Sequence, residues 1–161
     1  MNDNIQFKQA QTLWQEAYEH QLNGEFGEAI RLYKESIAVF PTAEAYTFLA
    51  WTYSTLGRYE AAIELCHQAI EIDPEFGNPY NDIGAYLIEL GRLDEAMPWL
   101  EKALMAPTYE ARHYPLLNIG RIYQQKGDHR RAIYYYNQAL ELEPFYQPAQ
   151  WAKQLLWGRL N

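Results

Sequence analysis

The chain has 161 residues, of which 48% are hydrophobic and 16% aromatic, so it can bury a substantial core. Its formal net charge is −8 and its pI is about 5.0, which argues against a nucleic-acid binder, because such proteins need a basic face to replace phosphate counterions. The single cysteine, Cys66, excludes an internal disulfide, and no apolar run approaches the roughly 18 residues that cross a bilayer.

The N-terminal segment MNDNIQFKQAQ is polar and lacks the cationic and then apolar pattern of a signal peptide. A reducing cytoplasm, where disulfides are rare, is the simplest setting for a chain with a single thiol. We therefore expect a cytoplasmic protein that does not insert into a membrane.

One pattern of 17 or 18 residues occurs four times along the chain. Each copy opens with a glycine and closes with a proline. The copies are GEFGEAIRLYKESIAVFP from Gly24, GRYEAAIELCHQAIEIDP from Gly57, GRLDEAMPWLEKALMAP from Gly91 and GDHRRAIYYYNQALELEP from Gly127. The opening glycines are 33, 34 and 36 residues apart. A period near 34 fits a helix–turn–helix unit with two helices of about 13 residues and two short turns.

The helix before each glycine carries packing residues at offsets of three, four and seven, which lie on one helical face. The third position is small, so the partner helix can approach closely. The expected residues are Tyr46, Leu49, Ala50 and Tyr53, then Tyr80, Ile83, Gly84 and Leu87, and then Leu116, Ile119, Gly120 and Tyr123.

The helix after each glycine has a small residue, a second packing residue four positions on, and a small residue three positions later. These triplets are Ala29, Tyr33 and Ser36; Ala62, Cys66 and Ala69; Ala96, Leu100 and Ala103; and Ala132, Tyr136 and Ala139. Small sites mark close helix crossings, and large sites fill the space between helices. The glycine should end the first helix in a left-handed turn, and the proline should stop the second.

This fourfold pattern of large, small, aromatic, glycine, alanine and proline positions resembles the tetratricopeptide repeat family. The resemblance implies an all-α, right-handed α-solenoid of stacked helix–turn–helix repeats with about nine helices. It implies a single domain over residues 1–161, with repeats at about 10–42, 43–76, 77–112 and 113–146. Glu16 and His20 replace apolar residues in the first copy, which suits an N-terminal cap with no predecessor to pack against.

The remaining segment, QPAQWAKQLLWGRLN, predicts a capping helix at about 147–160. Ala152, Leu155 and Leu156 are expected to face the fourth repeat, with Leu160 as a further candidate. Trp151 and Trp157 have two interpretations. They lie flat along the last repeat, or they form a self-association or partner contact, since exposed aromatic patches usually have a role.

The repeats and caps use up the chain and leave no segment for a catalytic domain. The four histidines are spread along the chain at positions 20, 67, 113 and 129, and none has a cysteine or second histidine at metal-ligand spacing. Cys66 occupies a packing site and is best interpreted as a buried small hydrophobe. We expect no catalytic, cofactor-binding or metal-binding residue, and no enzyme activity.

The first helices of such repeats line the concave side of a solenoid. Positions just after the leading packing residue, and four residues further on, should face this groove. Together with adjacent rows, they give the expected partner-binding residues Trp14, Tyr18, Thr47, Trp51, Asn78, Asn81, Asp82, Tyr114, Asn118 and Arg121.

Several groove residues have a second interpretation. Trp14 and Trp51 can fill gaps between adjacent first helices, and Trp151 can add to the groove from the last helix. Arg121 can hold a partner's carboxylate, pair with Asp82, or be a solvated or ion-paired surface residue. The longer connection MAPTYEARHYP, residues 105–115, should lie near one edge of the groove, either as a specificity element or as a tolerated insertion.

Some members of the family hold the C-terminal carboxylate of chaperone tails with two lysines, two asparagines and an arginine. Neither possible register of this chain places the required residues at those sites. The first register holds Trp14, Tyr18, Phe48, Asn78 and Asp82, and the second holds Thr47, Trp51, Asp82, Tyr114 and Asn118. We therefore expect no clamp of this kind.

The leading functional hypothesis is a non-catalytic module that binds a peptide or helix of another protein in its groove. The alternative is a homo-oligomeric scaffold, such as a homodimer joined through the C-terminal helix. An enzyme or an accessory subunit of one is a third interpretation. The sequence leaves the identity of the partner open.

Overall fold

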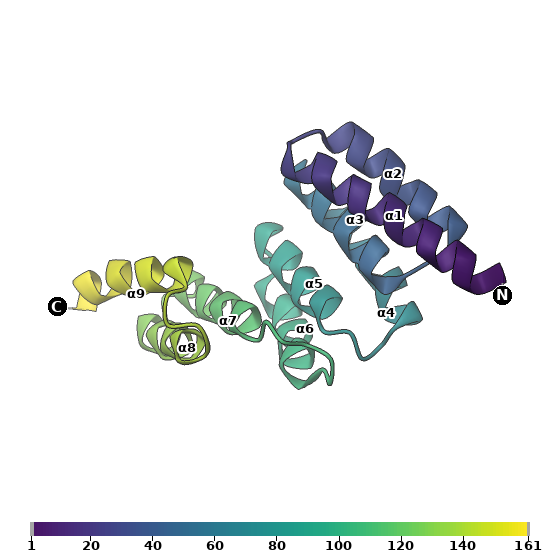
Figure 1. The fold of residues 1–161 in the computed structure, drawn as a ribbon. Coiled ribbons are helices and arrows are strands. Elements are labelled where there is room, and N and C mark those ends of the chain that lie inside the picture. The colour runs from purple at the N-terminus through teal and green to yellow at the C-terminus, as the bar shows by residue number, and fades with distance from the viewer. Residues whose placement is uncertain (1, 161) are drawn as a thin grey trace.

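The computed structural model describes residues 2–160, which form nine α-helices and no β-strand (Figure 1). The helices are α1 (Asn2–Leu22), α2 (Phe26–Val39), α3 (Ala43–Thr55), α4 (Tyr59–Ile72), α5 (Asn78–Glu89), α6 (Leu93–Met105), α7 (His113–Gln125), α8 (His129–Leu142) and α9 (Gln147–Leu160).

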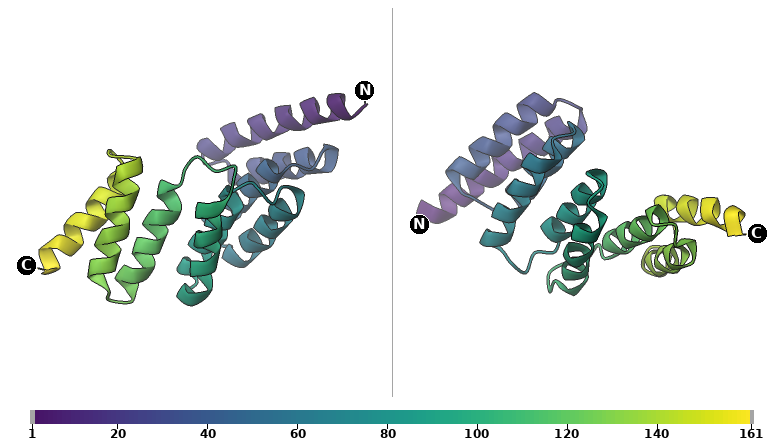
Figure 2. Two further views of the ribbon diagram at one scale, coloured as in Figure 1. Left: turned by 90° about the horizontal axis from the view of Figure 1, so that it is seen from below. Right: turned by 180° about the vertical axis from the view of Figure 1, so that it is seen from behind.

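The helices stack in chain order into an open array. Each helix packs against its neighbour in sequence, and α1, α3, α5 and α7 also touch one another in succession. The two ends of the chain lie at opposite ends of the array in all three views (Figures 1 and 2). The predicted all-α solenoid of helix–turn–helix units is therefore confirmed.

The core runs along the array between the first and second helices of the repeats. All twelve packing positions predicted in the second helices are buried, from Ala29 in α2 to Ala139 in α8. The hydroxyl groups of the two buried tyrosines among them form equivalent hydrogen bonds. Tyr33 donates its hydroxyl hydrogen to Gln21 Oε1 at 2.7 Å, and Tyr136 donates to Gln124 Oε1 at 2.6 Å. This pairing removes the cost of burying the hydroxyl without a partner.

The turns between paired helices have the predicted left-handed glycine. Gly57 has a φ of 75°, and its N–H donates to the Ser54 carbonyl at 2.9 Å while the Arg58 N–H reaches the Tyr53 carbonyl at 3.0 Å. This is the Schellman arrangement, which satisfies the last carbonyls of a helix. The other three opening glycines have φ between 76° and 82° and the same two bonds. Each second helix ends two residues before its proline, as predicted.

Two features at the ends of the array differ from the sequence-based expectation. Helix α1 begins at Asn2, because no glycine or proline interrupts it, and its extra turns are held by Phe7, whose ring lies 5.5 Å from that of Phe40. In α9, Ala149 and Leu156 are buried, whereas Leu155 is 67% exposed and Leu160 is also exposed. The expectation for Leu155 and Leu160 was wrong, because only a narrow stripe of α9 contacts α8.

The fold predicts a steric penalty at Gly120. A β-carbon there would lie 2.5 Å from Tyr136 Cε1, and that ring is fixed by its bond to Gln124. We expect Gly120→Ala to lower the free energy of unfolding by about 1–3 kcal/mol, as overpacked cores do. Gly27→Ala is the control, because a β-carbon there meets nothing within 4 Å. Urea unfolding followed by circular dichroism measures both, and equal midpoints for Gly120→Ala and wild type would refute the close-contact account.

Candidate functional site

A central cleft of about 370 Å³ opens among the first helices of the repeats. Its walls come from α1, α3, α5, the loop before α7, and α7 itself. The lining residues are Tyr18, Thr47, Phe48, Trp51, Asn78, Asn81, Asp82, Tyr109 and Tyr114. The structure thus brings together seven of the ten groove residues expected from the sequence.

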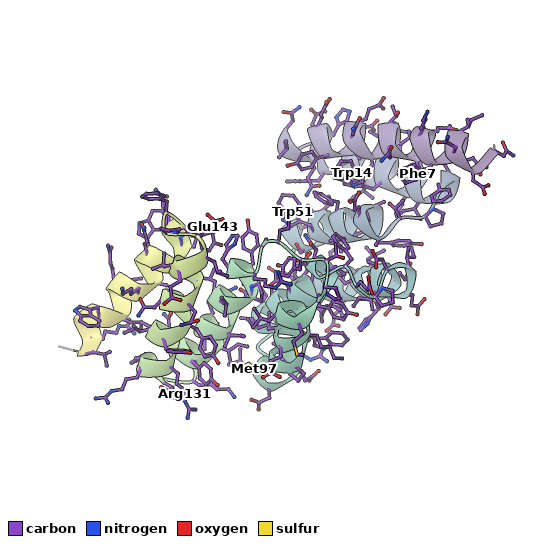
Figure 3. All side chains as sticks on the ribbon, turned by 60° about the horizontal axis from the view of Figure 1, so that its bottom comes forward. Phe7, Trp14, Trp51, Met97, Arg131 and Glu143 are labelled. Carbon is purple, nitrogen blue, oxygen red and sulfur yellow. The ribbon has the colours of Figure 1, made fainter. Side chains whose placement is uncertain are left out.

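One wall of the central cleft is a continuous row of aromatic rings. Trp14 stacks on Tyr18 with centroids 5.7 Å apart, Tyr18 meets the edge of Phe48 at 5.4 Å, and Phe48 meets Trp51 at 5.9 Å. Phe7 and Trp14 lie on the side of α1 that faces the following helices (Figure 3). Trp14 is partly buried and lines a separate hollow of about 70 Å³, so it fills the gap between α1 and α3. Trp51 is 43% exposed and offers its surface to a ligand.

The opposite wall is formed by tyrosines from the longer connection and from α7. Tyr114 is 42% exposed, and its ring meets that of Tyr146 at 5.6 Å. Tyr109 is buried beneath the wall and reaches the cleft from the loop. Phe48, which the sequence placed in a row next to the groove stripe, and Tyr109, which it placed near one edge of the groove, complete the lining. The signals that pointed to them were the row adjacent to the stripe for Phe48 and the unusual length of the connection for Tyr109.

The longer connection is fixed against the preceding inter-repeat loop. The Gly77 N–H donates to the Thr108 carbonyl at 3.0 Å, and the Thr108 N–H donates to the Glu75 carbonyl at 3.1 Å. A β-carbon at Gly77 would lie 2.3 Å from Tyr109 Cβ, so glycine permits this close approach. The Arg112 guanidinium donates to the carbonyls of Leu104, Ala106 and Tyr109. The longer connection is therefore a well-anchored part of the cleft wall.

A chain of hydrogen bonds connects α5 with α7 beside the cleft. Arg121 pairs with Glu89 at 2.7 Å and donates to Asn118 Oδ1 at 3.1 Å. Asn118 donates to Asn81 Oδ1 at 3.0 Å, and Asn81 donates to Asp82 Oδ1 at 3.3 Å. Because arginine can only donate, each amide accepts on the arginine side and donates toward Asp82.

This chain decides among the interpretations of Arg121, which is a partly exposed, ion-paired residue. The arginine pairs with Glu89 rather than with Asp82 and lines a neighbouring hollow with Leu117. Asn81 and Asn118 are buried and bonded to each other. These buried amides hold the two helices in register.

The Asp82 carboxyl is left without a cationic partner. None of the ion pairs among residues 2–160 includes it, and the only hydrogen-bond donor recorded for its side chain is Asn81. Burial disfavours its charged form and raises its pKa from an ordinary value of 3.8 to about 7, against a smaller opposing effect of the Asn81 hydrogen bond. Near neutral pH this side chain therefore sits at the balance between acid and carboxylate.

Three further features of the described residues bear on the kind of site that this chain can form. Within residues 2–160, no group of three or more histidines, cysteines, aspartates or glutamates could hold a metal ion. No helix in this range is long and apolar enough to cross a membrane. Cys66 is buried, and burial raises the pKa of its thiol well above the ordinary value, so the reactive thiolate is suppressed.

The raised pKa of Asp82 predicts a specific pH dependence of stability. The folded carboxyl keeps its proton up to about pH 7, whereas the unfolded one loses it near pH 4, so this group destabilises the fold progressively between these values. We expect Asp82→Asn to be more stable than wild type at pH 8 by an amount on the order of 1–3 kcal/mol, with the difference shrinking toward pH 4. Urea unfolding at pH 4, 6 and 8 measures this, and a pH-independent difference would contradict the assignment.

Comparisons with known proteins agree with the architecture. Two family models described as tetratricopeptide repeats match residues 43–76 and 77–142. The small glutamine-rich tetratricopeptide repeat-containing protein 2 of Mycosarcoma maydis is 33% identical over 81 residues, covering 50% of this chain and 23% of that protein. The photosystem I assembly protein Ycf3 of Prochlorococcus marinus is 29% identical over 119 residues, covering 67% of this chain and 69% of the relative.

The fold also matches a solved structure along nearly its whole length. The structure of PilF from Pseudomonas aeruginosa superposes with a TM-score of 0.87 over 96% of this chain and 70% of that one, at 21% identity. At this identity the similarity shows the fold alone. The four turn glycines, the twelve buried packing positions and the matches to both family models show that the chain belongs to the tetratricopeptide repeat family.

Proposed function

We propose that this chain is a non-catalytic interaction module whose central cleft binds an extended segment of a partner protein. Proteins of this repeat type bind other proteins, and the finer assignment to the cleft rests on its geometry. The observation that carries it is one hollow on the first-helix face, lined by residues from the first helices of all four repeats and from the connecting loop. A segment in this cleft would contact all of these elements at once.

The cleft has the properties of a preformed binding surface. Trp51 and Tyr114 expose aromatic area on opposite walls, and such residues often contribute about 2 kcal/mol or more each to binding. The buried bond between Asn81 and Asn118 and the anchored loop at Arg112 hold the walls in place. Binding to a rigid surface loses less conformational entropy, which favours affinity.

The relatives suggest the kind of work that such binding would serve. The relative from Prochlorococcus marinus is named as an assembly protein. We propose a comparable role for this chain, in which it brings proteins together in the cytoplasm without transforming them. Its negative net charge supports a protein partner over a nucleic acid.

A peptide selection tests the cleft directly. Random dodecapeptides displayed on phage are selected on the wild-type protein, and the tightest peptides are measured by isothermal titration calorimetry. We expect Trp51→Ala to weaken them by about 30-fold, which corresponds to about 2 kcal/mol. Trp151→Ala is the matched control, because this exposed tryptophan on α9 is outside the residues that line the cleft. Selection of no peptide, or equal affinity for Trp51→Ala and wild type, would refute the cleft assignment.

Self-association through α9 is the second candidate function. Trp157 is 55% exposed on this terminal helix, next to Trp151 and Leu155, which are exposed as well. Multi-angle light scattering on wild type and Trp157→Ala decides the question. A dimer that Trp157→Ala dissociates is the expected result for a scaffold, and a monomer in both samples removes this candidate.

A further inference from the structure

Asp82 is chemically isolated within the central cleft. It is the one acidic residue among the nine that line the cleft, and none of the nine is basic. The nearest arginine in its hydrogen-bond chain, Arg121, is already paired with Glu89. A partly buried carboxylate without a counter-ion is costly, and an opposite charge brought by a ligand would relieve that cost.

The other titratable groups around Asp82 do not supply this charge. Burial raises the pKa of Cys66, Tyr86 and Tyr109, so these groups remain neutral near pH 7. Burial lowers the pKa of His113, at the start of α7, which keeps this imidazole neutral as well. The Arg112 guanidinium donates to the backbone carbonyls of Leu104 in α6 and of Ala106 and Tyr109 in the loop.

The surroundings of Asp82 favour a cation over any other ligand group. Five of the nine lining residues are aromatic: Tyr18, Phe48, Trp51, Tyr109 and Tyr114. Aromatic faces attract ammonium and guanidinium groups, by about 2 kcal/mol or more where water is excluded. A partner's carboxylate would meet repulsion from Asp82 and from the net charge of −8.

We propose that the partner segment carries a lysine or arginine whose cationic head enters the central cleft and pairs with the Asp82 carboxylate. This inference rests on the proposed function, because it names the chemistry that the cleft recognises. The aromatic rings enclose the cation and the aliphatic stem of the side chain. The hydrogen bond from Asn81 holds the carboxylate in place for the contact.

The pairing couples binding to a proton. A bound cation stabilises ionised Asp82, so binding below about pH 7 must first release the carboxyl proton. The ionised fraction, and with it the affinity, falls about tenfold between pH 8 and pH 6 for a group that titrates near 7. The ligand's own lysine or arginine stays protonated throughout this window.

The test uses the same random dodecapeptides displayed on phage, restricted to those whose binding needs Trp51. We expect one position to be enriched in lysine or arginine. Replacing a lysine there by N-acetyllysine, or an arginine by citrulline, should weaken binding to wild type by about tenfold or more, the size of one desolvated charge contact. For Asp82→Asn, the cationic and neutral peptides should bind within about twofold of each other, and the tenfold pH effect should vanish.

Asp94→Asn is the matched control, because it removes the same charge at an exposed carboxylate of α6 that is not among the lining residues. It should behave as wild type toward both peptides, which separates a local contact from the effect of net charge. Trp51-dependent peptides without a basic position, or a cationic preference that Asp82→Asn retains, would overturn the inference while leaving the proposed function intact. If no peptide is selected, the proposed function fails and the inference fails with it.

Discussion

The structure depends on the close contact between the two helices of each repeat. Where the first helix has a glycine, a large side chain of the second helix occupies the vacant space, as Leu100 does against Gly84 and Tyr136 against Gly120. No repeat encloses a core of its own, so stability comes from stacking each hairpin on the next. Because this contact uses one face of each first helix, another face of α1, α3, α5 and α7 remains free to line a cleft.

The cleft exists because the regular stack is interrupted at one place. The 36-residue spacing between the third and fourth opening glycines adds a loop, and that loop folds back on the connection at Gly77. Tyr109 thereby packs closely against Gly77 and lines the same cleft as Tyr114 of α7, together with the aromatic residues of α1 and α3. An insertion that could have been tolerated at the surface has become part of the architecture of the site.

Electrostatics within the cleft follow from how the polar groups pair. Glu89 forms an ion pair with Arg121. The two buried asparagines link Arg121 to Asp82 through hydrogen bonds that are each donated toward Asp82. Arg121 is therefore already paired and not free to bind a partner's carboxylate. The Asp82 carboxylate, which does not pair with Arg121, faces the aromatic residues of the cleft. This arrangement has the opposite polarity to the lysine- and arginine-based clamp whose residues the chain lacks.

The sequence by itself determined the repeat, the helix ends and the buried positions. These features are local: a left-handed turn requires glycine, a proline stops a helix, and the spacing of Ala62, Cys66 and Ala69 places all three on one face. The same register also located most of the residues that now line the cleft. Only the tertiary structure decided that Arg121 pairs with Glu89, that the longer connection is anchored at Gly77, and that Leu155 stays exposed. Each of these depends on which residues of different segments meet in space. The pattern within one helix does not specify which residues of another segment it will contact.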